Sequence, residues 1–263
     1  MDFLRLPGRL FLEFLHYLGQ LAALAGDIGY AVSRGILRLR LVARQIVDIG
    51  YGSQTVVIVT GAFTGAVFTF QSYMKFKDFG VESSVGAVVS VALCRELGPV
   101  LAGLMVAGRV GAAMAADIGT MNVTEQIDAL RVMGVDPVGY LVVPRFIAML
   151  ISMPLLIAEC ITFGLVASYM VTVYGYGVPK PWFMSHMLEH TNMSDLWVGM
   201  IKGFVFGIII TLVSCHQGLM AKDGAVGVGN GTTRAVVISS LTLLIVNFFL
   251  SLLLNYVFPM GSS

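Results

Sequence analysis

The sequence predicts an all-α integral membrane protein with about five transmembrane helices, an N-terminal interfacial amphipathic helix and a short cytoplasmic helix between two spans. Of its 263 residues, 57% are hydrophobic and 12% are charged, and the mean hydropathy is +0.87. A soluble domain carries about 25% charged residues, so the composition excludes a large soluble globule. The 30 glycines suit close helix packing in lipid. The net charge of +1 leaves no basic excess of the kind that binds nucleic acid.

The N-terminal region is expected to lie on the membrane rather than cross it. In residues 2–25, apolar residues recur every three to four positions and polar or charged residues fill the other face. Such a helix lies in the membrane interface or packs on the protein's own spans. Residues 26–48 contain four arginines and are expected to continue as a second cytoplasmic or interfacial segment. Residues 1–48 therefore form one region, ahead of a transmembrane domain at 49–258.

Five stretches of this domain are long and apolar enough to span a membrane, which takes about 20 residues. They are expected near residues 53–74, 85–116, 144–173, 196–216 and 234–257. The second stretch contains Pro99, which removes a helical hydrogen bond and predicts a kink near Arg95. The first carries Gly61 and Gly65, a spacing that lets two helix backbones approach closely.

The distribution of Lys and Arg predicts the orientation, because cytoplasmic loops are enriched in both. With the N-terminus in the cytoplasm, ten of the 16 basic residues lie inside, three lie outside and three lie within spans. This arrangement places segment 117–143 and loop 217–233 in the cytoplasm. Residues 75–84, residues 174–195 and the C-terminus then face outward.

Three charged residues are expected within the outer half of the membrane, where charge is costly and usually functional. They are Arg95 and Glu96 in the second span and Lys202 in the fourth. Arg95 and Lys202 suit a headgroup that carries a phosphate. The alternative is a buried ion pair with a purely structural role. Glu159 in the third span could join the same polar pocket or hydrogen-bond a neighbouring helix.

Other polar residues in the spans favour structural roles. Arg109 and Asp117 lie eight residues apart near the cytoplasmic end of the second span, where a pair that snorkels or bridges to a loop is expected. His216 ends the fourth span and is expected at the interface. The glycine-rich stretch 224–231 lacks the Lys-Ser/Thr ending of a phosphate loop and predicts a flexible cytoplasmic turn.

One outward segment matches a zinc-protease signature. His186-Met187-Leu188-Glu189-His190 fits H-x-x-E-H and is expected on a small helix behind Lys180-Pro181-Trp182. A catalytic zinc ion needs a third protein ligand, and the sequence supplies none in the expected context. We therefore predict neither a metal site nor a catalytic site. An intramembrane metalloenzyme built on His186 and His190 stays as a minor alternative.

Residues 122–133 predict a short helix that is too polar to span. Thr124 is a candidate N-cap, and Glu125 would lie in the first turn, where the helix dipole favours negative charge. Gly134 and Asp136-Pro137 should end the helix. A short cytoplasmic helix between two spans is the form in which transporter permeases receive force from ATPase subunits.

Several motifs in chain order give residues 45–257 a close resemblance to permeases of the MlaE/YrbE type. They are R-E-L-G-P (95–99), A-G-R-V-G (107–111), A-A-D-I-G-T-M (115–121), T-E-Q-I-D-A-L (124–130), D-P (136–137), P-R (144–145) and G-T-T-R-A-V-V (231–237). The resemblance implies the permease subunit of an ABC transporter that moves phospholipid between a bacterial inner membrane and the outer membrane. ATP and Mg²⁺ would be held by separate subunits, so this chain needs no cofactor.

The resemblance also implies partners and site residues. The partners are a second copy of the chain, two ABC ATPase subunits, a ring of MCE-domain proteins on the outer face and, in some complexes, a STAS-domain protein. The lipid pocket would contain Arg95, Glu96 and Lys202. The coupling helix would supply the contacts to the ATPase through Thr124, Glu125, Gln126, Asp128, Leu130 and Arg131. The main alternative is a proton-coupled secondary transporter that uses Glu96 and Glu159, with His216.

Overall fold

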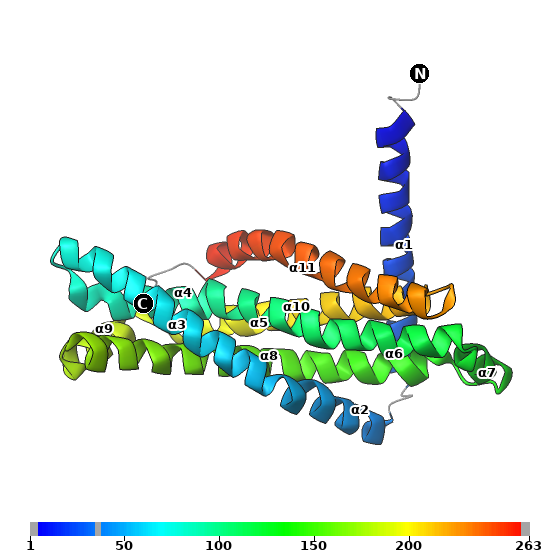
Figure 1. Cartoon of the computed structure of the whole chain (residues 1–263), viewed down its shortest axis with the longest axis horizontal. Coiled ribbons are helices and arrows are strands. Elements are labelled where there is room, and N and C mark those ends of the chain that lie inside the picture. The colour runs from blue at the N-terminus through cyan, green and yellow to red at the C-terminus, as the bar shows by residue number, and fades with distance from the viewer. Residues whose placement is uncertain (1–4, 35–37, 259–263) are drawn as a thin grey trace.

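The computed structural model describes residues 5–34 and 38–258, and each regular element in these ranges is a helix (Figure 1). Five helical stretches are long and apolar enough to cross a membrane. They are Leu39–Asp78, Val85–Val123, Val138–Gly175, Met193–Leu219 and Gly224–Val257. The predicted all-α membrane class with five spans is confirmed.

The chain order of the elements is as follows. The first span joins α2 (Leu39–Ile46), the π-helical turn η1 (Val47–Tyr51) and α3 (Gly52–Asp78). The 3₁₀ turn η2 (Glu82–Ser84) leads into α4 (Val85–Ala92), η3 (Leu93–Leu97), α5 (Gly98–Val106), η4 (Ala107–Gly111) and α6 (Ala112–Val123). The short α7 (Gln126–Val132) leads to η5 (Val138–Val142), α8 (Val143–Tyr169) and η6 (Met170–Gly175). The last elements are α9 (Lys180–His190), α10 (Met193–Leu219) and α11 (Gly224–Val257).

The spans lie lengthwise in one elongated bundle, with α9 at one end and α7 at the other (Figure 1). Helix α8 packs against both α3 and α10. Close approach of α3 to α8 depends on the predicted glycine pair, because a Cβ atom at Gly61 or Gly65 would overlap the backbone carbonyl of Cys160 or Gly164.

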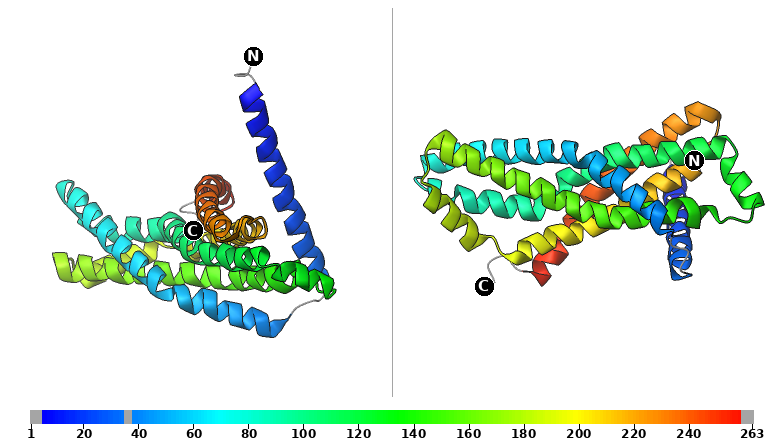
Figure 2. Two further views of the ribbon diagram at one scale, coloured as in Figure 1. Left: turned by 45° about the vertical axis from the view of Figure 1, so that its right-hand side comes forward. Right: turned by 90° about the horizontal axis from the view of Figure 1, so that it is seen from below.

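Helix α1 (Arg5–Ser33) runs crosswise to the bundle near its α7 end (Figures 1 and 2). Leu24, Ile28 and Ala31 are buried in a cluster with residues of α6, α7 and α8, while the more N-terminal Leu12 and Leu15 are 66% and 46% exposed. The described part of α1 is therefore anchored through its C-terminal half. The expected helix 2–25 starts outside the described residues and continues further than predicted, to Ser33.

Polar contacts between α1 and the end of α10 add to this anchor. The rings of Tyr17 and His216 meet edge to face with centroids 5.1 Å apart, and His216 Nε2 lies 3.1 Å from Gln20 Oε1. Burial raises the pKa of the Tyr17 phenol, while a hydrogen bond from Gln217 acts in the opposite direction. His216 is 7% exposed, so it docks α1 onto the end of α10.

Two predicted helix limits need correction. The first span begins at Leu39, so the expected division between residues 48 and 49 falls inside a continuous helix. The stretch 224–231 is the first part of α11 rather than a flexible turn. Gly231 lets α11 pack closely on the end of α10, because a Cβ atom there would lie 3.2 Å from the carbonyl oxygen of Gln217.

The start of α7 also differs from the prediction. Thr124 ends α6, where its hydroxyl donates to the carbonyl of Thr120 at 2.7 Å, and it does not cap α7. Glu125 occupies the N-cap position with φ at +58°, a left-handed conformation that reverses the chain between the two helices. The predicted stop at Gly134 is confirmed, with φ at +72°.

Candidate functional site

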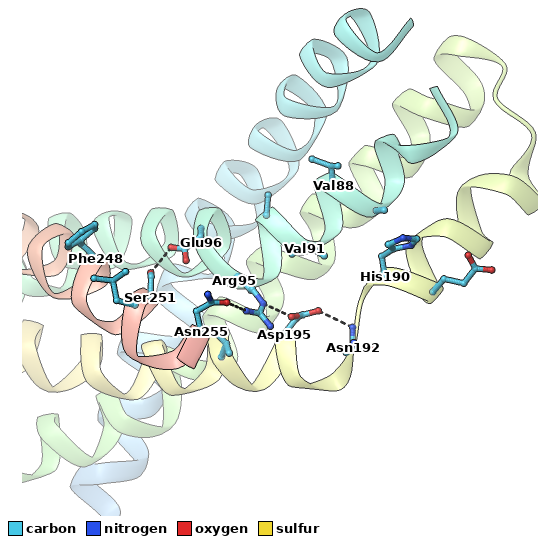
Figure 3. A pocket seen from close by; sticks show the side chains of 15 residues that line it. Val88, Val91, Arg95, Glu96, His190, Asn192, Asp195, Phe248, Ser251 and Asn255 are labelled. Atoms are coloured by element: carbon cyan, nitrogen blue, oxygen red, sulfur yellow. Dashed lines mark hydrogen bonds and ion pairs between the residues drawn. The ribbon is translucent and has the colours of Figure 1, made fainter. Parts of the chain in front are cut away.

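A cavity of about 760 Å³ opens near the α9 end of the bundle (Figure 3). Its walls come from α4, η3, α9, α10 and α11. The apolar part is formed by Ala87, Val88, Val91, Ala92, Val198, Phe248 and Leu252. The polar part is formed by Arg95, Glu96, Glu189, His190, Asn192, Asp195, Ser251 and Asn255. The cavity can therefore take an amphipathic ligand.

Arg95 is held at the polar side by three groups from distant parts of the chain. Its Nε donates to Asp195 Oδ1 at 2.5 Å, and its two terminal nitrogens donate to Asn255 Oδ1 at 3.3 Å and to the Phe258 carbonyl at 3.1 Å. Asp195 also accepts from the backbone N–H of Asn192 at 2.9 Å, as part of the capping box that starts α10. A guanidinium has five N–H donors, so two remain for a ligand.

Lys202 and Glu96 form a second polar centre next to the first. Lys202 Nζ donates to Glu96 Oε2 at 2.8 Å, to the Arg95 carbonyl at 2.6 Å and to Ser251 Oγ at 2.9 Å. Asn247 Nδ2 also donates to Glu96 Oε2, at 3.1 Å. An ammonium has three donors, so Lys202 is fully occupied, and its side chain is 0% exposed. Glu96 is 45% exposed and lines the cavity.

The local backbone explains how this centre forms. Pro99 has no N–H, so the carbonyl of Arg95 lacks its helical partner and accepts from Lys202 instead. The π-helical turn η3 spans Leu93–Leu97, just before the proline. Single π-helical turns inside α-helices are frequent at functional sites. Gly199 lets α10 come close enough, because a Cβ atom there would lie 2.7 Å from the Cys94 carbonyl.

The structure therefore brings the three predicted pocket residues together but gives them different positions. Arg95 and Glu96 line the cavity, whereas Lys202 lies behind Glu96 and is not part of the lining. Arg95 and Glu96 contact different partners, as expected for adjacent residues, which point about 100° apart on a helix. Sequence reasoning missed Asp195 and Asn255 as partners of Arg95, because they lie 100 and 160 residues away.

The remaining predicted polar residues lie outside the cavity lining. Arg109 donates to Ser53 Oγ at 2.7 Å, and Asp117 lies 3.7 Å from a guanidinium nitrogen of Arg145. Arg109 and Asp117 thus have separate partners, although both join helices as structural residues. Glu159 is half-buried on α8, apart from Glu96 and the cavity lining.

At the opposite end of the bundle, α7 shows one face to the exterior. Ile127 is buried and Leu130 is half-buried in the cluster that anchors α1, so Leu130 attaches α7 to the bundle. Thr124, Glu125, Gln126, Asp128 and Arg131 are exposed. Asp128 accepts from Arg131 at 2.8 Å on this face, and the neighbouring Val132 and Met133 are 89% and 67% exposed. This mixed polar and apolar face is available to a protein partner.

Comparisons with known proteins agree with these features. The family model described as Permease MlaE matches residues 42–253. A probable ABC transporter permease protein of Rickettsia felis is 43% identical over 244 residues, which cover 93% of this chain and 94% of the relative. A probable ABC transporter permease protein of Synechocystis is 39% identical over 231 residues, 88% of each chain.

A plant relative extends the comparison. The chloroplastic protein TRIGALACTOSYLDIACYLGLYCEROL 1 of Arabidopsis thaliana is 39% identical over 228 residues, which cover 87% of this chain and 65% of the relative. The family match and these relatives span nearly the whole bundle, including the cavity and α7. This chain is therefore a membrane permease that belongs to the MlaE family.

Proposed function

We propose that this permease moves phospholipid between the inner and outer membranes of a bacterium, driven by ATP hydrolysis in separate ABC ATPase subunits. The observation that carries the proposal is the cavity itself. Its volume of about 760 Å³ lies within the range of small-molecule sites, and its apolar walls meet one polar side. The Arabidopsis relative, whose name contains that of a galactolipid, supports lipid as the substrate class.

Within the cavity, Arg95 would bind the lipid phosphate. It lines the wall and retains two N–H donors, and guanidinium suits phosphate geometry. Glu96 lies beside it and presents an oxygen, Oε1, that has no hydrogen-bond partner among the described residues. Lys202 acts through Glu96: it fixes the carboxylate and supplies the charge that balances it. The acyl chains would lie along Val88, Val91 and the α11 residues.

The other end of the molecule would meet the ATPase. The exposed residues of α7 are suited to this contact, with Thr124 and Glu125 at the turn that joins α7 to the second span. Because α6 and α5 continue from that turn to η3, movement of α7 has a continuous helical path to Arg95. The N-terminus and α7 would then be cytoplasmic, with the cavity and the C-terminus on the periplasmic side.

The proposed assembly contains two copies of the chain, two ATPases, a ring of MCE-domain proteins over the cavity end and, in some complexes, a STAS-domain protein. Family membership supports ATPase partners, since the relatives are named as permeases of ABC transporters. It argues against a proton-coupled transporter, and the separation of Glu159 from Glu96 argues in the same direction.

The test combines energy dependence with lipid contact. In the purified complex, transport of labelled phospholipid should require ATP and should not follow a proton gradient alone. Crosslinking of a photoactivatable phospholipid should fall in Arg95→Ala. Arg109→Ala is the matched control, because it removes an arginine from the same span outside the cavity lining. Equal crosslinking in both variants, or transport without ATP, would overturn the proposal.

A further inference from the structure

A cluster on α9 is not explained by the permease function. Glu189 and His190 follow His186 by three and four residues, so each of them neighbours His186 on the helix surface. One ligand atom of each residue can be chosen so that all three atoms lie within 4.8 Å of one another. The cluster is accessible, since the side chains of His186 and Glu189 are 30% and 64% exposed.

The two imidazoles are oriented by their surroundings. His190 Nδ1 lies 3.0 Å from the carbonyl oxygen of His186. A carbonyl only accepts, so the proton must be on Nδ1, and the Nε2 lone pair of His190 is left free. Metal-binding histidines are commonly held in this way. The ring of His186 packs edge to face against Trp182, with centroids 6.3 Å apart, and its Nδ1 lies 3.7 Å from Glu189 Oε2.

We propose that His186, Glu189 and His190 form a binding site for a divalent transition metal ion, with Zn²⁺ the best-fitting choice. Two imidazoles and one carboxylate are a usual zinc donor set. Tetrahedral ligands at about 2.1 Å from zinc are about 3.4 Å apart, a separation that small rotations of these exposed side chains can reach. In the protease signature the glutamate is not a zinc ligand, whereas in the proposed site Glu189 is the third ligand.

The proposed metal site adjoins the cavity, so a bound ion would change the charge of the cavity rim. Glu189 and His190 also line the cavity, so a bound ion lies at the rim and brings two positive charges to it (Figure 3). Three protein ligands leave at least one coordination position for water. The ion would also bridge the last turn of α9, next to the capping box that starts α10. The metal site stands on the geometry of α9 alone and does not depend on lipid as the substrate.

The experiment is a zinc titration of the full chain in detergent, purified without a histidine tag. One equivalent should bind, and Co²⁺ should give the visible spectrum of nitrogen and oxygen ligands. His186→Ala and His190→Ala should each weaken binding by about tenfold or more, and Glu189→Gln should weaken it as well. His16→Ala is the matched control, since His16 is an exposed helical histidine on α1.

The results that would overturn the site are specific. They are no zinc binding, unchanged affinity in the variant lacking both His186 and His190, or an equal loss in His16→Ala. The loss of lipid crosslinking in Arg95→Ala reports on the proposed function separately, so the two proposals fail independently.

Discussion

At the scale of single residues, Lys202 compensates for the backbone hydrogen bond that Pro99 removes. The proline leaves a carbonyl without a helical donor inside the bundle, and an unpaired buried polar group is costly. Lys202 supplies that donor and in the same position neutralises Glu96. The Lys202 ammonium, whose burial in a membrane is unfavourable, thus donates to three acceptors. A buried ammonium of this kind is structural, although it determines the position of a residue in the cavity wall.

Removal of the Lys202 charge should therefore destabilise the fold through its partners. Lys202→Met removes the positive charge beside the Glu96 carboxylate, which keeps Asn247 and Ser251 as donors, and it leaves the Arg95 carbonyl without its Lys202 donor. The loss of these contacts costs about 2 kcal/mol. Thermal unfolding in detergent should show a lower midpoint. The double variant Lys202→Met with Glu96→Gln removes both charges and should recover part of the loss. If the two changes are simply additive, the pair is not energetically coupled.

The sequence predicted these residues only in part, for a physical reason. Hydropathy marks a charge inside an apolar run, which is why Arg95, Glu96 and Lys202 were identified. It carries no information on partners, and Asp195 joins Arg95 only because α10 packs against η3. Asp195 lies at the start of a span, where an acidic residue is ordinary, so the sequence pattern does not distinguish it from a simple helix cap.

At the scale of elements, the spans were predictable and their ends were not. Long apolar runs specify α8 and α10 almost fully, because the membrane leaves a hydrophobic stretch few alternatives to a helix. The errors fall where composition is mixed. Residues 224–231 are rich in glycine and read as a turn, yet they continue α11 because Gly231 allows close contact with Gln217. Such packing depends on the preceding helix, α10, and the composition of residues 224–231 alone does not reveal it.

Helix α7 gives a prediction at this scale. Asp128→Arg should place a positive charge on the face proposed to meet the ATPase, and like or misplaced charges across an interface cost several kcal/mol. Coupled transport should fall by about tenfold or more. ATP-dependent lipid transfer between vesicles containing the complex measures this effect.

The chain offers a matched control for helix stability. Asp128 and Arg131 pair along α7, so Asp128→Arg with Arg131→Asp restores an ion pair of reversed order within the helix. If the loss arises at the interface, the exchanged variant should stay impaired. Full recovery would instead show that the single variant only weakened α7, and it would remove the coupling role.

At the scale of the whole molecule, the shape of the chain suits a membrane. The bundle axis follows five apolar helices, and α1 lies across it near α7 (Figure 2). Exposed leucines at 12, 15 and 18 on α1 would be unfavourable in water but favourable in the lipid interface. We therefore expect the crosswise helix to lie at one membrane surface and the cavity to lie towards the other.

The exposed face of α11 is the surface on which we expect a second copy of the chain to pack. Phe248 and Leu252 line the cavity and yet are 60% and 58% exposed. Only 11% of the most apolar window of α11 is buried within the chain, compared with 50% for α10. A second copy of α11 against this face would close the cavity from the side, and lipid would then lie between the two copies.

Cysteine crosslinking tests this arrangement. The native Cys94, Cys160 and Cys215 are buried, so an introduced cysteine reports without interference. Leu252→Cys should form a disulfide-linked dimer in native membranes, because two α11 helices in contact bring equivalent Cα atoms within about 7 Å. Leu155→Cys on α8 is the control, since Leu155 is equally exposed, at 60%, but lies outside the cavity lining. Crosslinking through α8 alone would place the interface on the other side of the bundle, and the cavity would then open to lipid from each copy separately.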